Sequence, residues 1–257
     1  MPQQHQQLIV QQFTRQAIPF AQLPGHLDSL DLLLELTRPS SEDTVLDLAC
    51  GPGLVACAFA RQAGQVIGLD LTPAMLEQAA KRQQEQGLTN LVWKQGDVQA
   101  LSYADNSFSM VITRYSFHHL LDPQQTLAEM IRVCKPGGRV LVADVALPPE
   151  KSAAYDRLEI MRDPSHTHAL TTDEFSKLFL QSGLQECRQA SYGVELELEA
   201  QLRASFPNPG DEERIRQLVT EDIGIDNLGI NARRKDETVV YSVPISVFVG
   251  RKEVKKP

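Results

Sequence analysis

The sequence lacks the features that mark membrane, secreted and nucleic-acid-binding proteins. No apolar segment approaches the roughly 20 residues that a membrane-spanning helix needs. The N-terminus is rich in glutamine and has no basic segment followed by an apolar one, so we expect no secretory signal. The four cysteines are scattered without C-x-x-C spacing, which indicates reduced, mostly buried thiols and not a zinc site or disulfide framework. The net charge of −8, with only short basic clusters, argues against nucleic acid as the main partner.

The composition is that of a globular protein with a sizeable core. Hydrophobic residues make up 42% of the chain and charged residues 23%, as in soluble proteins. A length of 257 residues allows one large domain, or one domain with an insertion. Because there are no internal repeats and no clear linker, we predict a single domain over residues 1–257, in a cytoplasmic protein.

The stretch from Thr44 to Leu54 carries the strongest functional pattern. It begins as a short apolar run that contains Asp47, and it then breaks into a turn at Gly51 and Gly53. The residues that follow are rich in alanine and predict a helix. A strand, a tight glycine loop and a helix form the local plan of a nucleotide-type cofactor site at the carboxyl end of a parallel strand. Glycine adopts backbone angles closed to other residues, and N–H groups at the helix start can bind a carboxylate or phosphate.

A second acidic residue, Asp70, lies near the end of the second predicted strand, residues 65–71. An acid at this place can accept both ribose hydroxyls of an adenosine cofactor. The alternative role of helix N-cap suits Thr72 better, because Thr72 stands directly before Pro73. The glycines also fit the G-x-G-x-x-A fingerprint of a nicotinamide site, and an ordinary turn is a third alternative.

The residues around these positions resemble class I S-adenosylmethionine (SAM) methyltransferases. Asp47-x-Ala49-x-Gly51-x-Gly53 resembles motif I of that family, and the T-P-A-M-L sequence from Thr72 resembles its S/T-P-x-M-L stretch. Farther on, the pattern H-H-L … L-x-E-x-x-R-V-x-K-P-G-G resembles the ubiquinone/menaquinone-biosynthesis type (methyltransferase type 11) and related small-molecule enzymes. The resemblance covers about residues 42–146.

The resemblance implies an α/β fold with a Rossmann-like, doubly wound sheet of seven strands, mostly parallel with an antiparallel last strand, plus helical lid insertions. The expected core segments are 42–146, 173–191 and 238–251, and the expected lid segments are 1–25, 147–172 and 192–237. We expect the chain to start disordered and to become helical near Leu8, with Pro19 limiting any helix there. Residues 192–236 are expected to be mostly helical, and Pro244 in the last strand indicates a bend or an edge position.

The resemblance further implies SAM as the cofactor. Its methionine end would face the glycine loop, where Asp47 can meet the ammonium group. Asp97, after the third predicted strand, would accept a hydrogen bond from the adenine amino group, and a carboxylate suits that amine because it only accepts. The next residue, Val98, would supply a backbone N–H to the ring. The cofactor-binding residues so implied are Asp47, Ala49, Gly51, Gly53, Asp70, Leu71, Met75, Gly96, Asp97, Val98 and Arg114.

Histidines are the candidate catalytic residues. An acceptor hydroxyl or acidic carbon has to lose a proton when it is methylated, and a histidine can take it. His118 and His119 follow the fourth predicted strand at the ligand end of the sheet. Adjacent side chains point in different directions, so we expect only one of the two to face the cleft. His166 and His168, in a lid segment, are further candidates, and for each histidine the alternative is a structural role in its loop.

Missing motifs narrow the reaction. The Asn/Asp-Pro-Pro-aromatic motif of enzymes that methylate planar amino groups is absent after the fourth strand, and no Asp-Asp-Asn set of magnesium-dependent enzymes surrounds Asp144. We therefore expect no metal and a small, apolar or aromatic metabolite as acceptor, methylated on oxygen or carbon. Two alternatives stay open: an NAD(P)-dependent oxidoreductase, disfavoured because the chain shows no Tyr-x-x-x-Lys pair, and a non-catalytic SAM-binding protein.

Overall fold

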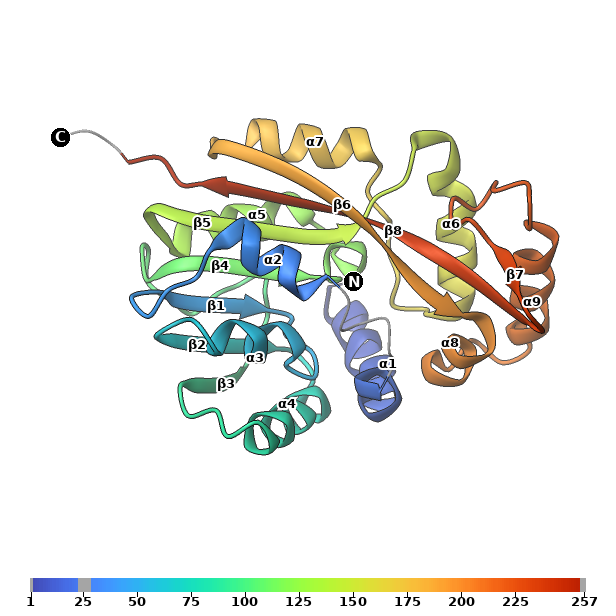
Figure 1. Ribbon diagram of the computed structural model, residues 1–257, viewed down its shortest axis with the longest axis horizontal. Helices are drawn as coiled ribbons and strands as arrows, with labels where there is room; N and C mark the ends of the chain where they lie inside the picture. Colours follow the sequence, from blue (N-terminus) through green and yellow to red (C-terminus); the bar gives the residue numbers. More distant parts are fainter. Residues whose placement is uncertain (1, 23–28, 255–257) are drawn as a thin grey trace.

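A single sheet runs through the computed structural model, which describes residues 2–22 and 29–254 (Figure 1). The strand order is β3-β2-β1-β4-β5-β8-β6, and β7 pairs with β8 outside this path. β1 to β5 are parallel to one another, whereas β8 is antiparallel to both β5 and β6. The strands are β1 (Thr44–Leu48), β2 (Gln65–Asp70), β3 (Leu91–Gln95), β4 (Phe108–Arg114), β5 (Cys134–Val145), β6 (Gln185–Glu197), β7 (Arg233–Lys235) and β8 (Thr238–Arg251).

Helices cover both faces of the sheet. Successive residues of a strand point to opposite faces, so a strand that is apolar throughout needs a core on each side. In β4, Met110 and Ile112 pack into a core shared with α2 and α3, whereas Val111 packs into a second core shared with α5 and α7. Burial on both faces is typical of parallel strands. The helices are α1 (Pro2–Gln22), α2 (Leu30–Thr37), α3 (Leu54–Ala60), α4 (Pro73–Glu85), α5 (Pro123–Val133), α6 (Pro149–Arg162), α7 (Thr172–Gln181), α8 (Leu198–Ser205) and α9 (Asp211–Glu221).

The predicted doubly wound, mostly parallel sheet is confirmed, with one correction to its strands. The short β7 adds an eighth strand in a segment expected to be helical, and β6 continues to Glu197, beyond its predicted end at Ser191. Past the end of β5, β6 and β8 still pair with each other as far as Glu197 opposite Val240. The alternation of Val194 and Leu196 with acidic residues was the sequence signal for this extension, because period-two patterning favours a strand.

Pro244 lies in a central strand, so the predicted edge position is wrong for the sheet as a whole. At Pro244 itself, however, β8 has no regular partner on the β5 side. The last residue of β5, Val145, pairs with Ile245, one residue short of Pro244. The Ala146 N–H donates to the Pro244 carbonyl. The missing proline N–H therefore faces the side on which regular pairing with β5 has ended.

The N-terminal helix departs from expectation as well. α1 begins at Pro2 and contains Pro19, although disorder was expected at the start and a limit at the proline. Glutamine is a good helix former, and two glutamines tie the helix to its neighbours. Gln12 donates to the Ser205 carbonyl at the end of α8, and Gln16 donates to Asp163 (2.6 and 2.9 Å). Leucines at 27, 30, 32, 33, 34 and 36 predict a helix from Leu27. α2 begins at Leu30 instead, and Leu27 itself lies outside the described residues.

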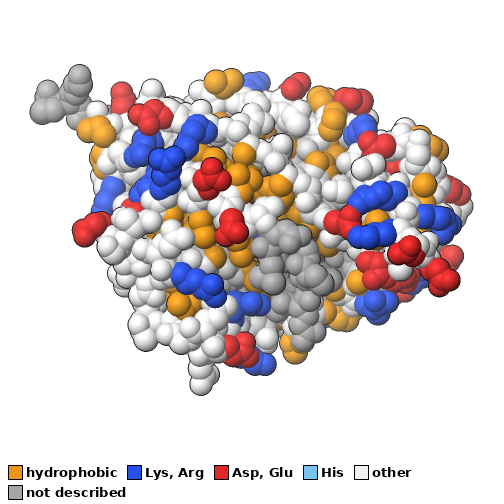
Figure 2. Space-filling model, viewed as in Figure 1, with side chains coloured by type: hydrophobic (Ala, Val, Ile, Leu, Met, Phe, Trp, Pro, Cys, Tyr) orange, Lys and Arg blue, Asp and Glu red, His pale blue; other side chains and the backbone are white. Residues whose placement is uncertain are grey.

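The helices outside the sheet layers gather at one end of the molecule. In Figure 1, α6, α8 and α9 lie beyond the ends of β4 and β5, and α1 lies between them and α4. Within residues 2–22 and 29–254, no helix is both long and apolar enough to cross a bilayer. On the face seen in Figure 2, lysine and arginine side chains are interspersed with acidic ones.

Candidate active site

Two adjoining cavities open at the carboxyl ends of the parallel strands. The first encloses about 1070 Å³ of empty volume, including space open to solvent, and lies between the glycine loop, the ends of β1 and β2, and α1. The second encloses about 650 Å³ and lies between the end of β4, β8, α6 and α8. Phe13, Tyr115 and His119 line both. We call them the cofactor cavity and the acceptor cavity, after the roles proposed below.

The two motif glycines have different surroundings. Gly51 lines the cofactor cavity with a φ of 51°, and an added Cβ would meet nothing within 4 Å. Gly53 has a φ of 77°, and its Cβ would lie 2.8 Å from Trp93 and 2.9 Å from Ala79. Both angles belong to the left-handed region that favours glycine. Gly53 thus allows the loop to pack on β3 and α4, whereas Gly51 leaves an open cradle for a ligand.

Asp47 faces the cofactor cavity from β1 as a buried acid. Its side chain is 1% exposed, and its Oδ2 has no hydrogen-bond partner among the described residues. Burial raises the pKa of Asp47 to about 8, and the nearby charge of Arg114 opposes that rise. Arg114 lines the same cavity, with its guanidinium 4.6 Å from the centre of the Tyr115 ring. The cavity thus holds an acid with one oxygen that lacks a donor, close to a cation.

Asp70 shapes the loops that border the cofactor cavity. Its two carboxylate oxygens accept the backbone N–H groups of Gly51 and Thr72, both at 2.8 Å. Burial raises the pKa of Asp70 in spite of these two donors. Thr72 occupies the N-cap position of α4 as predicted, although its hydroxyl makes no capping bond. Asp70 also lines the cavity, so it can meet a ligand there while it holds the glycine loop.

Asp97 already accepts a hydrogen bond across the cofactor cavity. Its Oδ2 accepts from the side-chain amide of Gln6 on α1 at 2.7 Å, and its Oδ1 accepts from the Gln99 N–H. His5, next to Gln6, contacts the His119 carbonyl at 2.7 Å. The contribution of α1 to this cavity was not identified from the sequence, because no short motif marks the glutamines that reach it.

The other predicted cofactor residues divide into two groups. Ala49, Leu71, Met75 and Val98 line the cofactor cavity together with the acids and Arg114. Gly53 and Gly96 are not among its lining residues. A Cβ on Gly96 would lie 2.9 Å from a methyl group of Leu69, so this glycine allows close packing beneath the site.

His118 lines the acceptor cavity and forms a dyad with a buried acid. Its Nδ1 lies 2.6 Å from Asp144 Oδ1, and Asp144 also accepts the N–H groups of Ser116, Phe117 and Val145. Burial lowers the pKa of His118, but the Asp144 carboxylate more than offsets this and holds it above its usual value. With Nδ1 on the carboxylate, Nε2 is the atom left to accept a proton. The sequence did not assign Asp144 this role.

The expectation that only one of the two adjacent histidines faces the cleft is wrong, because His118 and His119 both line the acceptor cavity and their ring centroids lie 4.2 Å apart. His119 Nδ1 lies 3.0 Å from the Ser165 carbonyl, and its ring meets Phe13 edge-on with centroids 5.0 Å apart. Burial, together with the charge of His118, lowers the pKa of His119 to about 3. His119 is therefore a neutral wall residue shared by both cavities.

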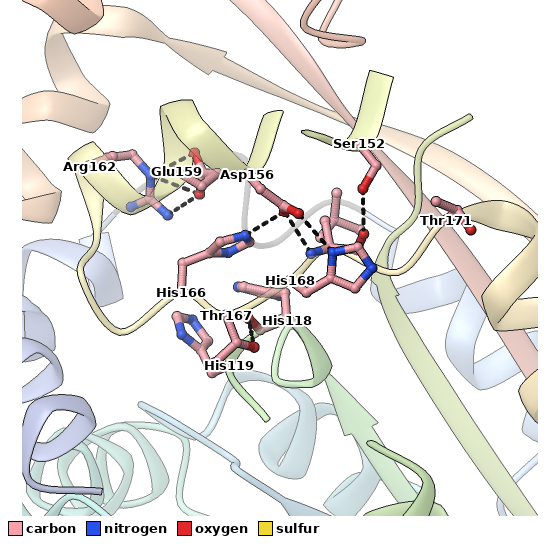
Figure 3. A network of polar contacts seen from close by, with 12 residues as sticks. His118, His119, Ser152, Asp156, Glu159, Arg162, His166, Thr167, His168 and Thr171 are labelled. Atoms are coloured by element: carbon pink, nitrogen blue, oxygen red, sulfur yellow. Dashed lines mark hydrogen bonds and ion pairs between the residues drawn. The ribbon is translucent and has the colours of Figure 1, made fainter. Parts of the chain in front are cut away.

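His166 lines neither cavity, and its side chain is fully buried. Its Nε2 lies 2.7 Å from Asp156 Oδ1, and the second oxygen of Asp156 lies 2.7 Å from His168 Nδ1 (Figure 3). The ring centroids of His166 and His118 are 5.6 Å apart. The structure thus places His166 behind the dyad and not against a ligand. Among the residues described, no group of three potential metal ligands is present.

Comparison with known proteins places this geometry in a family. Residues 39–187 match the family model described as "Methyltransferase domain". An uncharacterised methyltransferase of Bacillus subtilis, YcgJ, is 33% identical over 154 residues, which are 59% of this chain and 61% of the relative. A ubiquinone/menaquinone biosynthesis C-methyltransferase of Legionella pneumophila is also 33% identical, over 57% of this chain and 61% of the relative. The chain thus spans about three fifths of the length of these curated relatives.

Solved structures show the same fold. The crystal structure of YcgJ from Bacillus subtilis superposes with a TM-score of 0.80 at 24% identity, covering 88% of this chain and 99% of that one. A phosphoethanolamine N-methyltransferase of Haemonchus contortus in complex with SAM gives a TM-score of 0.64 at 17% identity, covering 88% of this chain and 53% of that one.

Proposed function

The chain belongs to the methyltransferase-domain family, and we propose that it transfers the methyl group of SAM to an oxygen or carbon atom of a small, apolar or aromatic metabolite. The family match confirms the resemblance inferred from residues 42–146. It removes the oxidoreductase alternative, because SAM is the cofactor expected of this family and fold.

The residues of the cofactor cavity fit SAM. The carboxylate oxygen of Asp47 that lacks a donor suits the ammonium of the methionine moiety, and Arg114 supplies a positive charge for its carboxylate. The open space at Gly51 lets a ligand approach the backbone directly. Asp70 and Asp97 line the same cavity, which supports our proposal that Asp70 accepts from the ribose hydroxyls and Asp97 from the adenine amine.

The His118–Asp144 dyad is the observation that carries the proposed activity. It faces a second cavity that shares three wall residues with the cofactor cavity, so a molecule bound there lies next to the cofactor. Bound SAM supplies a methyl group that its own sulfonium activates. His118 Nε2 accepts the proton of the acceptor hydroxyl or acidic carbon, and Asp144 holds the imidazole in the required tautomer. Such a dyad also favours an enzyme over a non-catalytic binding protein.

The remaining segments exclude water and shape the acceptor cavity. α1, α6 and α8 supply most of the wall that the sheet does not, and we propose that the described parts of the expected lid segments, residues 2–22, 147–172 and 192–237, act together as a lid. Because methyl transfer is an in-line displacement, positioning the acceptor and excluding water are the main tasks of the protein.

Parallel calorimetric titrations with SAM, S-adenosylhomocysteine and NADH test the cofactor. We expect micromolar binding of the two sulfur ligands and no binding of NADH. Radiolabelled SAM with a panel of phenols and enols then tests the transfer. Binding of NADH alone would overturn the proposal, and SAM binding without transfer to any acceptor would favour the non-catalytic alternative.

A further inference from the structure

The acceptor cavity has a second polar wall besides the His118–Asp144 dyad. It is formed by Tyr155 and Glu159 of α6, Gln201 of α8 and Tyr241 of β8. None of these four residues lines the cofactor cavity. The wall therefore contacts a part of the acceptor other than the atom that lies next to the cofactor.

Among the four residues of this wall, Gln201 has a fully buried polar atom without a partner. It is 7% exposed, and its side-chain oxygen Oε1 is buried without a hydrogen-bond donor among the described residues. Buried polar atoms are nearly always hydrogen-bonded, because an unmade bond leaves the full cost of desolvation. Gln201 lines the cavity, so a rotation of its side-chain amide would bring Oε1 within reach of a bound O–H or N–H donor.

Arg162, which lines the acceptor cavity, is already paired with an acid. The Arg162 guanidinium donates to both oxygens of Glu159, at distances between 2.5 and 3.0 Å (Figure 3). Burial raises the pKa of Glu159, but Arg162 more than offsets this, so the pair stays ionised. Asp163 adds a negative charge and accepts from Gln16. Arg162 is the only arginine or lysine among the described lining residues, so no unpaired cation is available for an acidic acceptor.

We propose that the acceptor is a neutral molecule that carries a second hydrogen-bond donor, which binds Gln201 Oε1, and that Gln201 selects for it. The apolar part of the molecule packs against Val194, Leu196 and Val243. This inference rests on the proposed function, because it takes the second cavity as the acceptor site.

The test measures binding and not turnover, so that it does not depend on finding the natural acceptor. The protein is saturated with S-adenosylhomocysteine and titrated calorimetrically with three matched pairs. These are phenol with resorcinol, 1-naphthol with 1,5-dihydroxynaphthalene, and 4-phenylphenol with 4,4′-dihydroxybiphenyl. In at least one pair, we expect the diol to bind about tenfold more tightly than the mono-ol. A carboxylate in place of the second hydroxyl is expected to abolish binding.

Two variants test whether Gln201 causes the preference for the diol. Gln201→Leu keeps a similar volume but removes the carbonyl, so we expect it to lose the preference for the diol while it binds the mono-ol at least as well as the parent. Gln217→Leu changes an exposed glutamine of the nearby helix α9 and should keep the preference. Thermal unfolding of each variant checks that it is folded.

Each outcome decides a different point. Equal binding within all pairs, or a diol preference that survives Gln201→Leu, overturns the inference. Binding of S-adenosylhomocysteine without any of the six probes also overturns it, whereas the proposed cofactor would stand. Failure to bind S-adenosylhomocysteine at all would contradict the proposed function itself.

Discussion

We expect Gln6 to compete with the cofactor for Asp97, and this predicts a mutation that tightens cofactor binding. The Gln6 amide donates to Asp97 Oδ2 at 2.7 Å, where we propose that the adenine amino group binds. This hydrogen bond has to break before the adenine can dock. Gln6→Ala removes that cost, so we expect the variant to bind SAM more tightly than the parent.

The magnitude follows from the kind of bond. A hydrogen bond to a charged group contributes about 1.5–3 kcal/mol, and the lower value applies here because the Gln6–Asp97 bond is only partly buried. About 1.4 kcal/mol corresponds to tenfold, so we expect the SAM dissociation constant to fall up to about tenfold. Asp97→Ala should act in the opposite direction and weaken binding by about 1–3 kcal/mol, because the adenine contact itself is lost.

Isothermal titration calorimetry with SAM provides the assay. Gln7→Ala is the matched control, because Gln7 is an exposed neighbour on the same helix and the change in helix propensity is the same. Unchanged or weaker SAM binding by Gln6→Ala, with Gln7→Ala like the parent, would refute the competition. Tightening in both variants would point instead to the helix as a whole.

Three further predictions concern the dyad, the glycine loop and Asp47. His118→Asn should lower kcat by about 10²–10⁴-fold with near-normal SAM binding. Because only neutral His118 accepts a proton, kcat should rise with pH through a pKa above 6.5. Asp144→Asn should move that rise to lower pH, because it removes the carboxylate that raises the pKa of His118. An Asp144→Asn pH profile identical to that of the parent would count against the dyad. Gly51→Ala should abolish SAM binding and lower the free energy of unfolding by about 1–2 kcal/mol, because alanine is strained at a positive φ. Gly53→Ala should lower the free energy of unfolding by at least about 2 kcal/mol, since its Cβ would also overlap Trp93 and Ala79. Urea unfolding measures the loss of stability, and calorimetry measures SAM binding. Asp47 has a folded pKa of about 8 against 3.8 for the free side chain, so its burial makes the free energy of unfolding fall as the pH rises from about 4 to about 8. Asp47→Asn should remove that fall and raise the Tm at pH 8 while weakening SAM binding, and a lower Tm would contradict the assignment.

The sequence alone determined the part of the site that depends on local patterns. A glycine turn between a strand and a helix, and an acid at the end of each of the first three strands, are short-range features. The carboxyl ends of adjacent parallel strands meet at one edge of the sheet, so Asp47, Asp70 and Asp97 come together once the strand order is set. His118 was found for the same reason, because it follows β4 directly.

Only the tertiary structure decided which residues from distant parts of the chain join these side chains at the two cavities. Asp144 lies 26 residues after His118, Gln6 lies 91 residues before Asp97, and Gln201 comes from an insertion without a motif. Their roles depend on how α1, α6 and α8 dock beyond the sheet. That docking is determined by side-chain packing and by bonds such as those of Gln12 and Gln16, which no periodicity specifies. Local sequence therefore determined which acids line the cofactor cavity, whereas long-range packing determined the partner of His118 and the shape of the acceptor cavity.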